Sequence, residues 1–270
     1  MTDQPTVTLN DGRTMPQVGQ GVFLVPPEEA RTLVETGIRL GYRHIDTATF
    51  YQNESGVGEA VRASDETIFV TTKLWNGEQG RDRTLAAFDR SFNELGLDWI
   101  DLYLIHWPVP SQDLYVETWK TFIELQREGR VKSIGVSNFQ VEHLERIVGE
   151  TGVVPVTNQI ELHPGLQQNE LVEYHREHGI ATTSWSPLGR GAMLEEPLLA
   201  EIADKHGKSV AQVILRWHTE RDLVVIPKAS SEGRLRENLD LFGFTLDEDD
   251  MARIASLDRD QRIGPHPNSM

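Results

Sequence analysis

The segment HIDTATFYQNE (residues 44–54) places an aspartate, Asp46, and a tyrosine, Tyr51, five residues apart. A buried carboxylate needs a partner because desolvating its charge is costly. Lys73 could be that partner, and its ammonium would also lower the pKa of Tyr51 from about 10 by favouring the phenolate. His106 could act as a neutral donor that orients a substrate oxygen toward the phenol. These four side chains together would suit proton delivery to a carbonyl group.

Each of these residues also has an ordinary structural explanation. Asp46 could cap a turn, and Lys73 could be a solvated lysine at the end of a strand. Tyr51 could pack within a loop, and His106 could bind backbone groups in the core. The chemistry therefore depends on whether the fold brings the four side chains together.

Short β-branched runs alternate along the chain with segments in which apolar residues recur at helical spacing. The runs are apolar on both faces, which is typical of parallel strands covered by helices. Eight such units in about 250 residues predict a (β/α)8 TIM barrel. The Asn-Asp-Gly turn within residues 7–15 predicts an additional N-terminal β-hairpin. The barrel strands are expected at 15–23, 43–47, 68–74, 99–107, 131–138, 154–162, 179–185 and 222–228.

An open doubly wound sheet would show the same alternation of strands and helices. When it binds a dinucleotide, such a sheet carries the G-x-G-x-x-G fingerprint after a strand. The two nearest segments, GQG at 19–21 and GVG at 56–58, lack the third glycine. Because no Pro/Gly/Ser-rich linker or charge block divides the chain, we expect one barrel domain over residues 1–270.

The carboxyl ends of the expected strands carry polar, charged or indole groups. In a barrel this end holds the active site, which favours a common function for them. The residues concerned are Asp46, Lys73, His106, Ser137, Asn138, Gln159, Trp185 and Lys228.

The formal charge of −16, from 26 basic and 42 acidic residues, argues against general binding of nucleic acid or anionic membranes. It leaves room for an anionic ligand held by a local basic cluster, and Lys228, Arg234 and Arg236 form one. The absence of cysteine excludes disulfides and thiolate metal sites. The N-terminal residues show neither a basic start nor an apolar run, and no segment approaches the length of a membrane span, so we expect a cytoplasmic protein.

Seven segments resemble the aldo-keto reductases in order and spacing, nearly from end to end. They are GYRHIDTATFYQNE, TTKLWN, DLYLIHWP, IGVSNF, NQIELHP, SWSPLGRG and IPKASSEGRLREN. Within this family the sequence most resembles bacterial enzymes of the 2,5-diketo-D-gluconate reductase type, partly because SWSPLG carries Trp rather than Tyr at the stacking position. The resemblance implies a monomer that reduces aldehydes or ketones with NADPH in preference to NADH. Substrates of this kind include 2,5-diketo-D-gluconate and small dicarbonyls such as methylglyoxal.

The resemblance also assigns roles to individual residues. Tyr51 would be the general acid, Lys73 paired with Asp46 would lower its pKa, and His106 would position the carbonyl. Ser137, Asn138 and Gln159 would hold the carboxamide of the nicotinamide, and Trp185 would stack on its ring. The loop from Ser186 to Gly191 would cover the pyrophosphate. The segment from Lys228 onward would hold the 2′-phosphate and the adenine. The cofactor residues implied are Ser137, Asn138, Gln159, Trp185, Ser186, Pro187, Leu188, Gly189, Gly191, Ile226, Lys228, Ala229, Ser230, Arg234, Glu237 and Asn238.

Aromatic residues near the strand ends would wall an apolar funnel for the substrate and exclude water. The substrate residues expected are Phe23, Phe50, Trp75, His106, Trp107 and Phe139. The tail at 259–270 would form the mouth of this funnel, and His266 could touch a substrate. One departure from the family pattern is Ala229, which stands where a serine is usual, so one phosphate contact is in doubt.

Two other functions fit parts of the sequence. A metal-dependent barrel hydrolase could use His44, Asp46, His106 and His163, although it would leave Tyr51 and Trp185 without roles. A cofactor-binding barrel with little catalysis is the second alternative. We expect no metal site, because the four proton-delivering residues explain more of the sequence.

Overall fold

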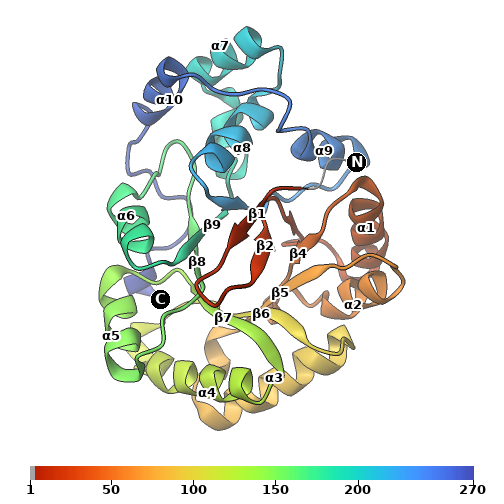
Figure 1. Cartoon of the computed structure of the whole chain (residues 1–270), viewed down its shortest axis with the longest axis vertical. Helices are drawn as coiled ribbons and strands as arrows, with labels where there is room; N and C mark the ends of the chain where they lie inside the picture. The colour runs from red at the N-terminus through yellow and green to blue at the C-terminus, as the bar shows by residue number, and fades with distance from the viewer. Residues whose placement is uncertain (1–3) are drawn as a thin grey trace.

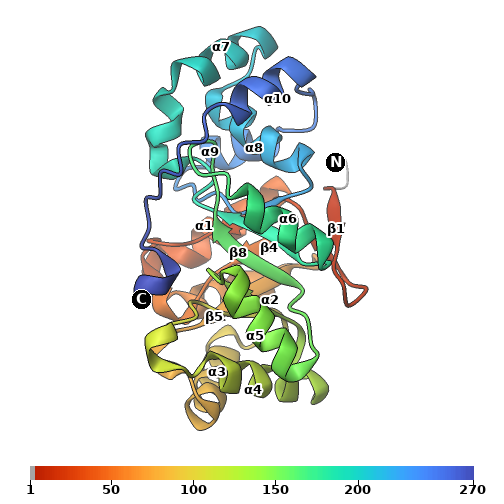
Figure 2. The ribbon, with the colours of Figure 1, turned by 90° about the vertical axis from the view of Figure 1, so that its left-hand side faces the viewer.

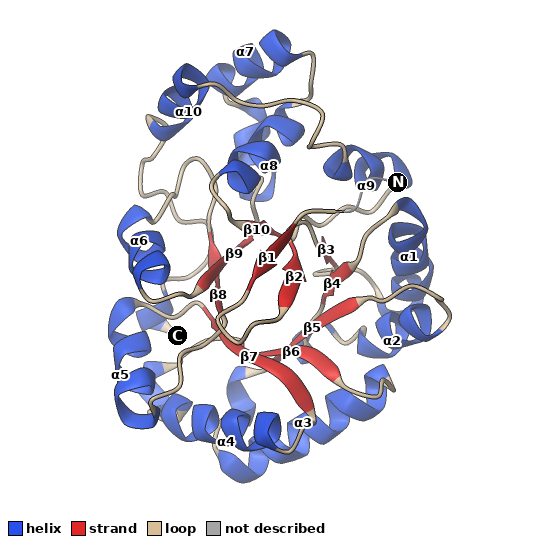
Figure 3. Ribbon diagram, in the orientation of Figure 1, coloured by secondary structure: helices blue, strands red, loops and turns tan. Residues whose placement is uncertain are grey.

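Within residues 4–270, which the structure describes, eight short parallel strands form an inner ring and helices form an outer ring around it (Figure 1, Figure 3). The structure is a computed structural model. The strands follow one another in sequence order, and the ring closes between its first and last members. At the closure Gly19 N–H donates to Val225 O (2.8 Å) and Val225 N–H donates to Gln17 O (2.9 Å). The predicted TIM barrel is confirmed.

The hairpin and the barrel strands account for all the β-structure in the described residues. The hairpin consists of β1 (Thr6–Thr8) and β2 (Thr14–Pro16). The barrel strands are β3 (Gln20–Gly21), β4 (His44–Asp46), β5 (Phe69–Leu74), β6 (Ile100–Ile105), β7 (Val131–Ser137), β8 (Thr157–Glu161), β9 (Ala181–Trp185) and β10 (Val224–Val225).

Helices follow the strands and bury one apolar face each. Their ends carry the expected signals: Gly41, in the left-handed conformation at φ 116°, ends the first helix, and Ser209 caps α8 through Gln212. The α-helices are α1 (Pro27–Leu40), α2 (Glu54–Arg62), α3 (Arg81–Leu95), α4 (Tyr115–Arg127), α5 (Val141–Thr151), α6 (Asn169–Glu177), α7 (Pro197–His206), α8 (Val210–Glu220), α9 (Glu232–Leu239) and α10 (Glu248–Ala255).

The hairpin closes the amino-terminal end of the barrel. Leu9 and Met15 are buried in one apolar cluster with Leu102, Leu104 and other residues of the barrel strands. The hairpin lies at the opposite end of the barrel from the C-terminal tail (Figure 2). Because the amino-terminal end is filled in this way, the carboxyl ends of the strands are left to form a cavity.

Two expected strands are much shorter than predicted. Residues 14–16 belong to the hairpin, and only Gln20–Gly21 enter the barrel sheet at this point. Gly21 lies so close to the last strand that a Cβ atom there would be 2.6 Å from Ile226 O. The last strand is reduced to Val224–Val225, because Pro227 has no N–H to continue the ladder. Helix α10 was not anticipated from the sequence.

None of the helices in the described residues combines the length and apolar character that crossing a bilayer requires. Residues 1–3 lie outside the described part of the chain, so the expectation about the N-terminal segment is untested there.

Candidate active site

The carboxyl ends of β4 and β5 bring Asp46 and Lys73 into direct contact. Lys73 Nζ lies 2.5 Å from Asp46 Oδ1, donates to Thr47 O at 2.8 Å, and lies 3.5 Å from the Tyr51 hydroxyl. Both side chains of the ion pair are almost fully shielded from water. The loop after β4 therefore folds Tyr51 back over Lys73, which is the arrangement that proton delivery requires.

A short 3-10 helix, Thr49–Tyr51, turns the chain so that Tyr51 faces Lys73. One hydrogen bond ties the turn to β5, and another joins the residues before and after it. Thr49 Oγ1 donates to Lys73 O (3.0 Å), and Thr47 Oγ1 donates to Asn53 Oδ1 (2.7 Å). The amide of Asn53 in turn donates to Val22 O (3.0 Å), in the segment that carries Phe23. These bonds fix the position of the phenol before any ligand binds.

A second buried carboxylate, Glu54, lies beneath this turn and was missed in the sequence. It accepts hydrogen bonds from Thr72 Oγ1 (2.6 Å) and Ser91 Oγ (3.1 Å), and Ser91 is also 3.0 Å from Thr49 Oγ1. Burial raises the pKa of Glu54, while the two hydroxyl groups oppose this shift. The acidic residue in QNE, directly after the loop of Tyr51, was the available signal, but the partners of its carboxylate come from two other elements, β5 and α3.

Electrostatics at the site follow from burial as much as from charge. Burial raises the pKa of Tyr51 above 10, and the opposing effect of Lys73 does not overcome it. The predicted net lowering of the pKa of Tyr51 is therefore wrong for this structure. Burial alone would lower the pKa of Lys73, but Asp46 and Tyr51 raise it overall. Burial and the Lys73 charge hold the pKa of His106 well below 6.5, so its imidazole is neutral near pH 7.

The three polar residues expected to hold the nicotinamide are linked to the proton-delivering residues. Gln159 Nε2 donates to Asp46 Oδ2 (2.8 Å), and Ser137 Oγ donates to Gln159 O (2.7 Å). Asn138 Nδ2 donates to His106 O (2.9 Å), and its Oδ1 accepts from Trp185 Nε1 (2.8 Å). One continuous network thus spans β4, β7, β8 and β9.

These side chains face a cavity of about 290 Å³ at the carboxyl end of the barrel. The stacked rings of Phe50 and Trp75 (4.0 Å) and the contact of Phe23 with Tyr51 (5.0 Å) build one of its walls. Of the lining residues, Gly21 was not anticipated from the sequence, whereas Arg190 belongs to the loop expected over the pyrophosphate and Pro265 and Met270 belong to the tail expected at the mouth. The lining consists of Gly21, Phe23, Asp46, Phe50, Tyr51, Trp75, His106, Trp107, Ser137, Asn138, Gln159, Trp185, Ser186, Arg190, Ile226, Lys228, Pro265 and Met270.

Two expected substrate contacts are wrong. Phe139 is fully buried and packs on Tyr115 and His143, because the chain turns away from the cavity at Asn138 (φ 63°). His266 is exposed, and its Nδ1 accepts from the backbone N–H of Asn268 rather than facing the cavity.

The other residues expected to hold the cofactor do not belong to the lining of this cavity. They are Pro187, Leu188, Gly189, Gly191, Ala229, Ser230, Arg234, Glu237 and Asn238. Ala229 is buried in an apolar cluster with Val18 and Leu235, which accounts for a side chain without a hydroxyl at this position.

The basic cluster after the last strand contains two available cations rather than three. Arg236 Nη2 pairs with Glu232 Oε1 (3.1 Å), and Arg39 pairs with the same carboxylate (3.0 Å). The side chains of Lys228 and Arg234 are exposed and form no ion pair within residues 4–270. They flank the start of α9, where backbone N–H groups favour an anion.

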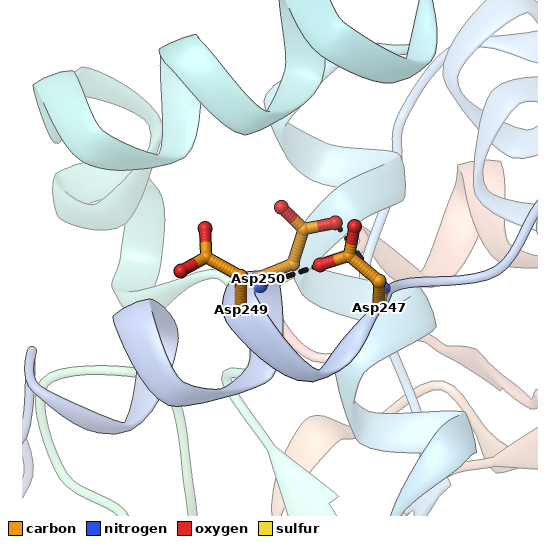
Figure 4. A group of neighbouring side chains, drawn as sticks. All are labelled: Asp247, Asp249 and Asp250. Carbon is orange, nitrogen blue, oxygen red and sulfur yellow. Dashed lines mark hydrogen bonds between the residues drawn. The ribbon is translucent and has the colours of Figure 1, made fainter.

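The residues considered for a metal hydrolase do not come together in the described structure. His44 Nε2 lies 3.0 Å from Thr71 Oγ1, and His163 Nε2 lies 3.2 Å from Glu161 Oε1. A different acidic group, Asp247, Asp249 and Asp250, gathers at the start of α10 (Figure 4). Lys205 binds Asp247 and Asp250, and His206 Nε2 lies 2.7 Å from Asp250 Oδ2, so protein side chains already occupy these two carboxylates.

The sequence model of the aldo/keto reductase family matches residues 16–259. The chain belongs to this family. It is 51% identical over 268 residues to an aldo-keto reductase of Mycolicibacterium smegmatis, covering 98% of each chain. It is 49% identical to the methylglyoxal reductase DkgA of Escherichia coli, covering 99% of this chain and 98% of the other. The crystal structure of a variant of Gox0644 in complex with NADPH matches with a TM-score of 0.97 and 53% identity, covering 99% and 98% of the two chains.

The protein is thus an oxidoreductase of the aldo/keto reductase family, as its resemblance implied. A small-molecule carbonyl substrate is consistent with this membership.

Proposed function

We propose that this aldo/keto reductase reduces small aldehydes and ketones to alcohols with NADPH, and that Tyr51 delivers the proton. The observation that carries the proposal is the hydroxyl of Tyr51 beside Lys73 Nζ (3.5 Å), with Asp46 bound to the same ammonium, on the wall of a cavity. The similarity to a methylglyoxal reductase and to a protein crystallised with NADPH supports the same assignment.

The residues around the cavity fit a dinucleotide with a 2′-phosphate. Trp185 presents an indole face at the wall, and Ser137, Asn138 and Gln159 supply amide and hydroxyl groups beside it. Lys228 and Arg234 form no ion pair within residues 4–270 of a protein of net charge −16, and cations of this kind bind phosphate oxygens strongly. When bound, NADPH would supply the hydride that the carbonyl carbon takes up.

Proton delivery is assigned to the residues at the ends of β4, β5 and β6. The raised pKa of Tyr51 keeps its phenol protonated near neutral pH, so the hydroxyl is ready to donate to a carbonyl oxygen. The Lys73 ammonium, held charged by Asp46, would stabilise the phenolate as the proton leaves. His106, neutral and at the cavity wall, would orient the carbonyl oxygen.

The shape of the cavity favours a small substrate. Its volume of about 290 Å³ must accommodate the nicotinamide as well as the carbonyl compound. The side chains around Tyr51 are aromatic: Phe23, Phe50, Trp75 and Trp107. Small 2-oxoaldehydes such as methylglyoxal therefore fit better than a charged sugar acid such as 2,5-diketo-D-gluconate.

We further propose that the enzyme acts as a cytoplasmic monomer without nucleic-acid or membrane partners. The high negative charge supports the absence of nucleic-acid and membrane partners, because it opposes association with other polyanions. Light scattering of the purified protein would test whether it is a monomer, and fractionation of cells that express it would test whether it is cytoplasmic.

The experiment that tests the function follows NADPH oxidation with methylglyoxal, a simple aldehyde and 2,5-diketo-D-gluconate, and repeats it with NADH. We expect turnover with NADPH, fastest with methylglyoxal. Tight NADPH binding without turnover of any carbonyl would instead support a cofactor-binding barrel with little catalysis.

Cofactor choice is tested by Lys228→Ala with Arg236→Ala as the matched control. Losing one charge-assisted phosphate contact should raise the Kd for NADPH about tenfold or more, with little change for NADH. Arg236 already pairs with Glu232, so its removal should change the Kd for NADPH far less. Equal effects of the two variants would contradict the assigned role of Lys228.

A further inference from the structure

We propose that Glu161 is a positioning residue that holds the C-terminal segment 262–270 against Trp185 and so fixes one wall of the substrate cavity. The inference rests on the proposed function, since it concerns the wall of the same cavity. Glu161 is the last residue of β8, and Trp185 is its partner at the end of β9. The chain runs from α10 to the C-terminus at the end of the barrel opposite the hairpin (Figure 2). On this path Ile263 and Gly264 contact Glu161, and Gly264 also approaches Trp185.

The carboxylate of Glu161 binds two consecutive backbone N–H groups of the tail. Oε1 accepts from Ile263 N–H at 2.6 Å, and Oε2 accepts from Gly264 N–H at 2.9 Å. His163 Nε2 lies 3.2 Å from Oε1, and Arg262 Nη1 lies 4.0 Å from Oε2. The side chain is fully buried, so these donors are what compensates the loss of water around its charge.

The ionised form of Glu161 is favoured in this setting. Burial on its own would raise the pKa of its carboxyl group. The hydrogen bonds from His163 and from the two backbone N–H groups outweigh burial and leave the pKa lowered overall. The carboxylate can therefore accept from both tail N–H groups at once.

The anchored tail lies close against the Trp185 ring at Gly264. A Cβ atom at Gly264 would lie 2.6 Å from Trp185 Cη2 and 3.0 Å from Glu161 Oε2, so only glycine allows this approach. The other end of the indole is fixed as well, because Trp185 Nε1 donates to Asn138 Oδ1 at 2.8 Å. The indole ring is thus held from both ends, by the tail and by the network of the active site.

Beyond Gly264 the tail reaches the cavity itself, where Pro265 and Met270 form part of the lining. Its other hydrogen bonds to the barrel are a partly buried one from Arg262 Nη2 to Gln168 Oε1 (3.1 Å) and two exposed ones, from Ser111 Oγ to Met270 O (3.2 Å) and from Asn268 Nδ2 to Glu142 Oε1 (2.9 Å). Exposed bonds of this kind compete with water, whereas the bonds to Glu161 do not. Glu161 is therefore the anchor on which the position of this wall depends.

The first test compares Glu161→Gln with Glu248→Gln, which makes the same change on the exposed face of α10. The readout is the rate at which trypsin cuts after Arg262 and releases residues 263–270, followed by mass spectrometry. Losing the charge-assisted bonds should speed the cut roughly tenfold in Glu161→Gln and leave the control at the wild-type rate. Equal rates in the two variants would overturn the proposal.

The second test uses Gly264→Ala with Gly243→Ala as control, and it applies even where Glu161→Gln fails to fold. A methyl group at residue 243 would meet no atom within 4 Å, whereas one at residue 264 would displace Trp185 or the tail. We expect Gly264→Ala to raise the KM for the carbonyl substrate several-fold with a smaller change in kcat, because the Asp46–Lys73 pair is untouched. A folded Gly264→Ala enzyme with the wild-type KM would contradict the assigned role of the tail.

The two proposals fail in different ways. If the wild-type protein turns over no carbonyl, the proposed function falls, while the trypsin comparison still tests the anchor. If the wild-type protein turns over carbonyls and all four variants match it in KM and cleavage rate, the anchor falls and the function stands.

Discussion

Two clusters of this protein pair a lysine with aspartates, and they differ in what surrounds them. At the strand ends, Lys73 and Asp46 are 0% and 2% exposed and share their site with Tyr51. Between α7 and α10, Lys205 binds Asp247 (2.6 Å) and Asp250 (2.8 Å), with its side chain 43% exposed. The first cluster faces a cavity, while the second completes a capping box of α10. Charged composition alone does not make an active site; burial beside a cavity does.

The largest effect should come from removing the phenol of the strand-end cluster. We expect Tyr51→Phe to lower kcat by about 10²–10⁴-fold, because the general acid is lost while the cavity keeps its shape. Steady-state kinetics with NADPH and methylglyoxal would measure this, with fluorescence titration to check that NADPH still binds. Tyr174→Phe, on the surface helix α6, is the control and should behave like the wild type. A Tyr51→Phe enzyme that keeps most of its kcat would refute the proposed mechanism.

Removing the lysine from each cluster should separate a buried pair from an exposed one. Lys73→Met leaves Asp46 buried without its cation, which should cost about 3–5 kcal/mol of unfolding free energy. Lys205→Met should cost much less, because water solvates the exposed Asp247, while the buried Asp250 keeps its contacts with His206 Nε2 and with the backbone N–H of Asp247. Urea denaturation of both variants measures the difference. The double variant Asp46→Asn with Lys73→Met should recover part of the loss, and equal losses in the two single variants would erase the distinction.

Acid should destabilise the fold through its buried histidines, among them His44. Burial lowers the pKa of His44, which lies two residues before Asp46 on β4, from 6.5 to about 4. Between these values the unfolded chain binds a proton that the folded chain does not, so stability is lost as the pH falls from 6.5 to 4, by about 3 kcal/mol. Urea midpoints measured against pH should fall over this range. His44→Gln should flatten the dependence, whereas the exposed His178→Gln should not.

The smallest effect should come from the cluster at α10. Hydrogen bonds from Lys205 and from the backbone of α10 lower the pKa of Asp247 from 3.8 to about 2. Its stabilising effect is therefore present above pH 3.8 and is lost only as the pH falls toward 2. Asp247→Asn should change the urea midpoint slightly at neutral pH, and less in high salt because the pair is exposed. A large change in the urea midpoint of Asp247→Asn near pH 5 would contradict the difference between the two clusters that their burial indicates.

Much of the fold was predictable because it depends on local patterns. Runs that are apolar on both faces, separated by helical segments, led to the barrel, and the order of polar strand ends led to Asp46, Lys73 and His106. The strand-end rule works because parallel strands share one carboxyl edge. The predicted strand ranges were too long at the first and last barrel strands: only Gln20–Gly21 enter the sheet, and Pro227 has no N–H to continue the last ladder.

Other features depended on contacts between residues far apart in the sequence. Glu54 and Glu161 look like ordinary surface acids until the fold buries them among donors from other elements. The sequence made Arg236 a candidate to bind phosphate, but in the fold its guanidinium pairs with Glu232.

The sequence by itself determined which side chains stand at the strand ends, since alternation of strands and helices and the order of motifs are written in it. Only the tertiary structure decided that Tyr51 lies 3.5 Å from Lys73 Nζ, that its pKa is raised, and that Phe139 faces the core. The physical reason is that a pKa depends on desolvation and on the distances to all nearby charges. Those quantities exist only once the whole chain has packed.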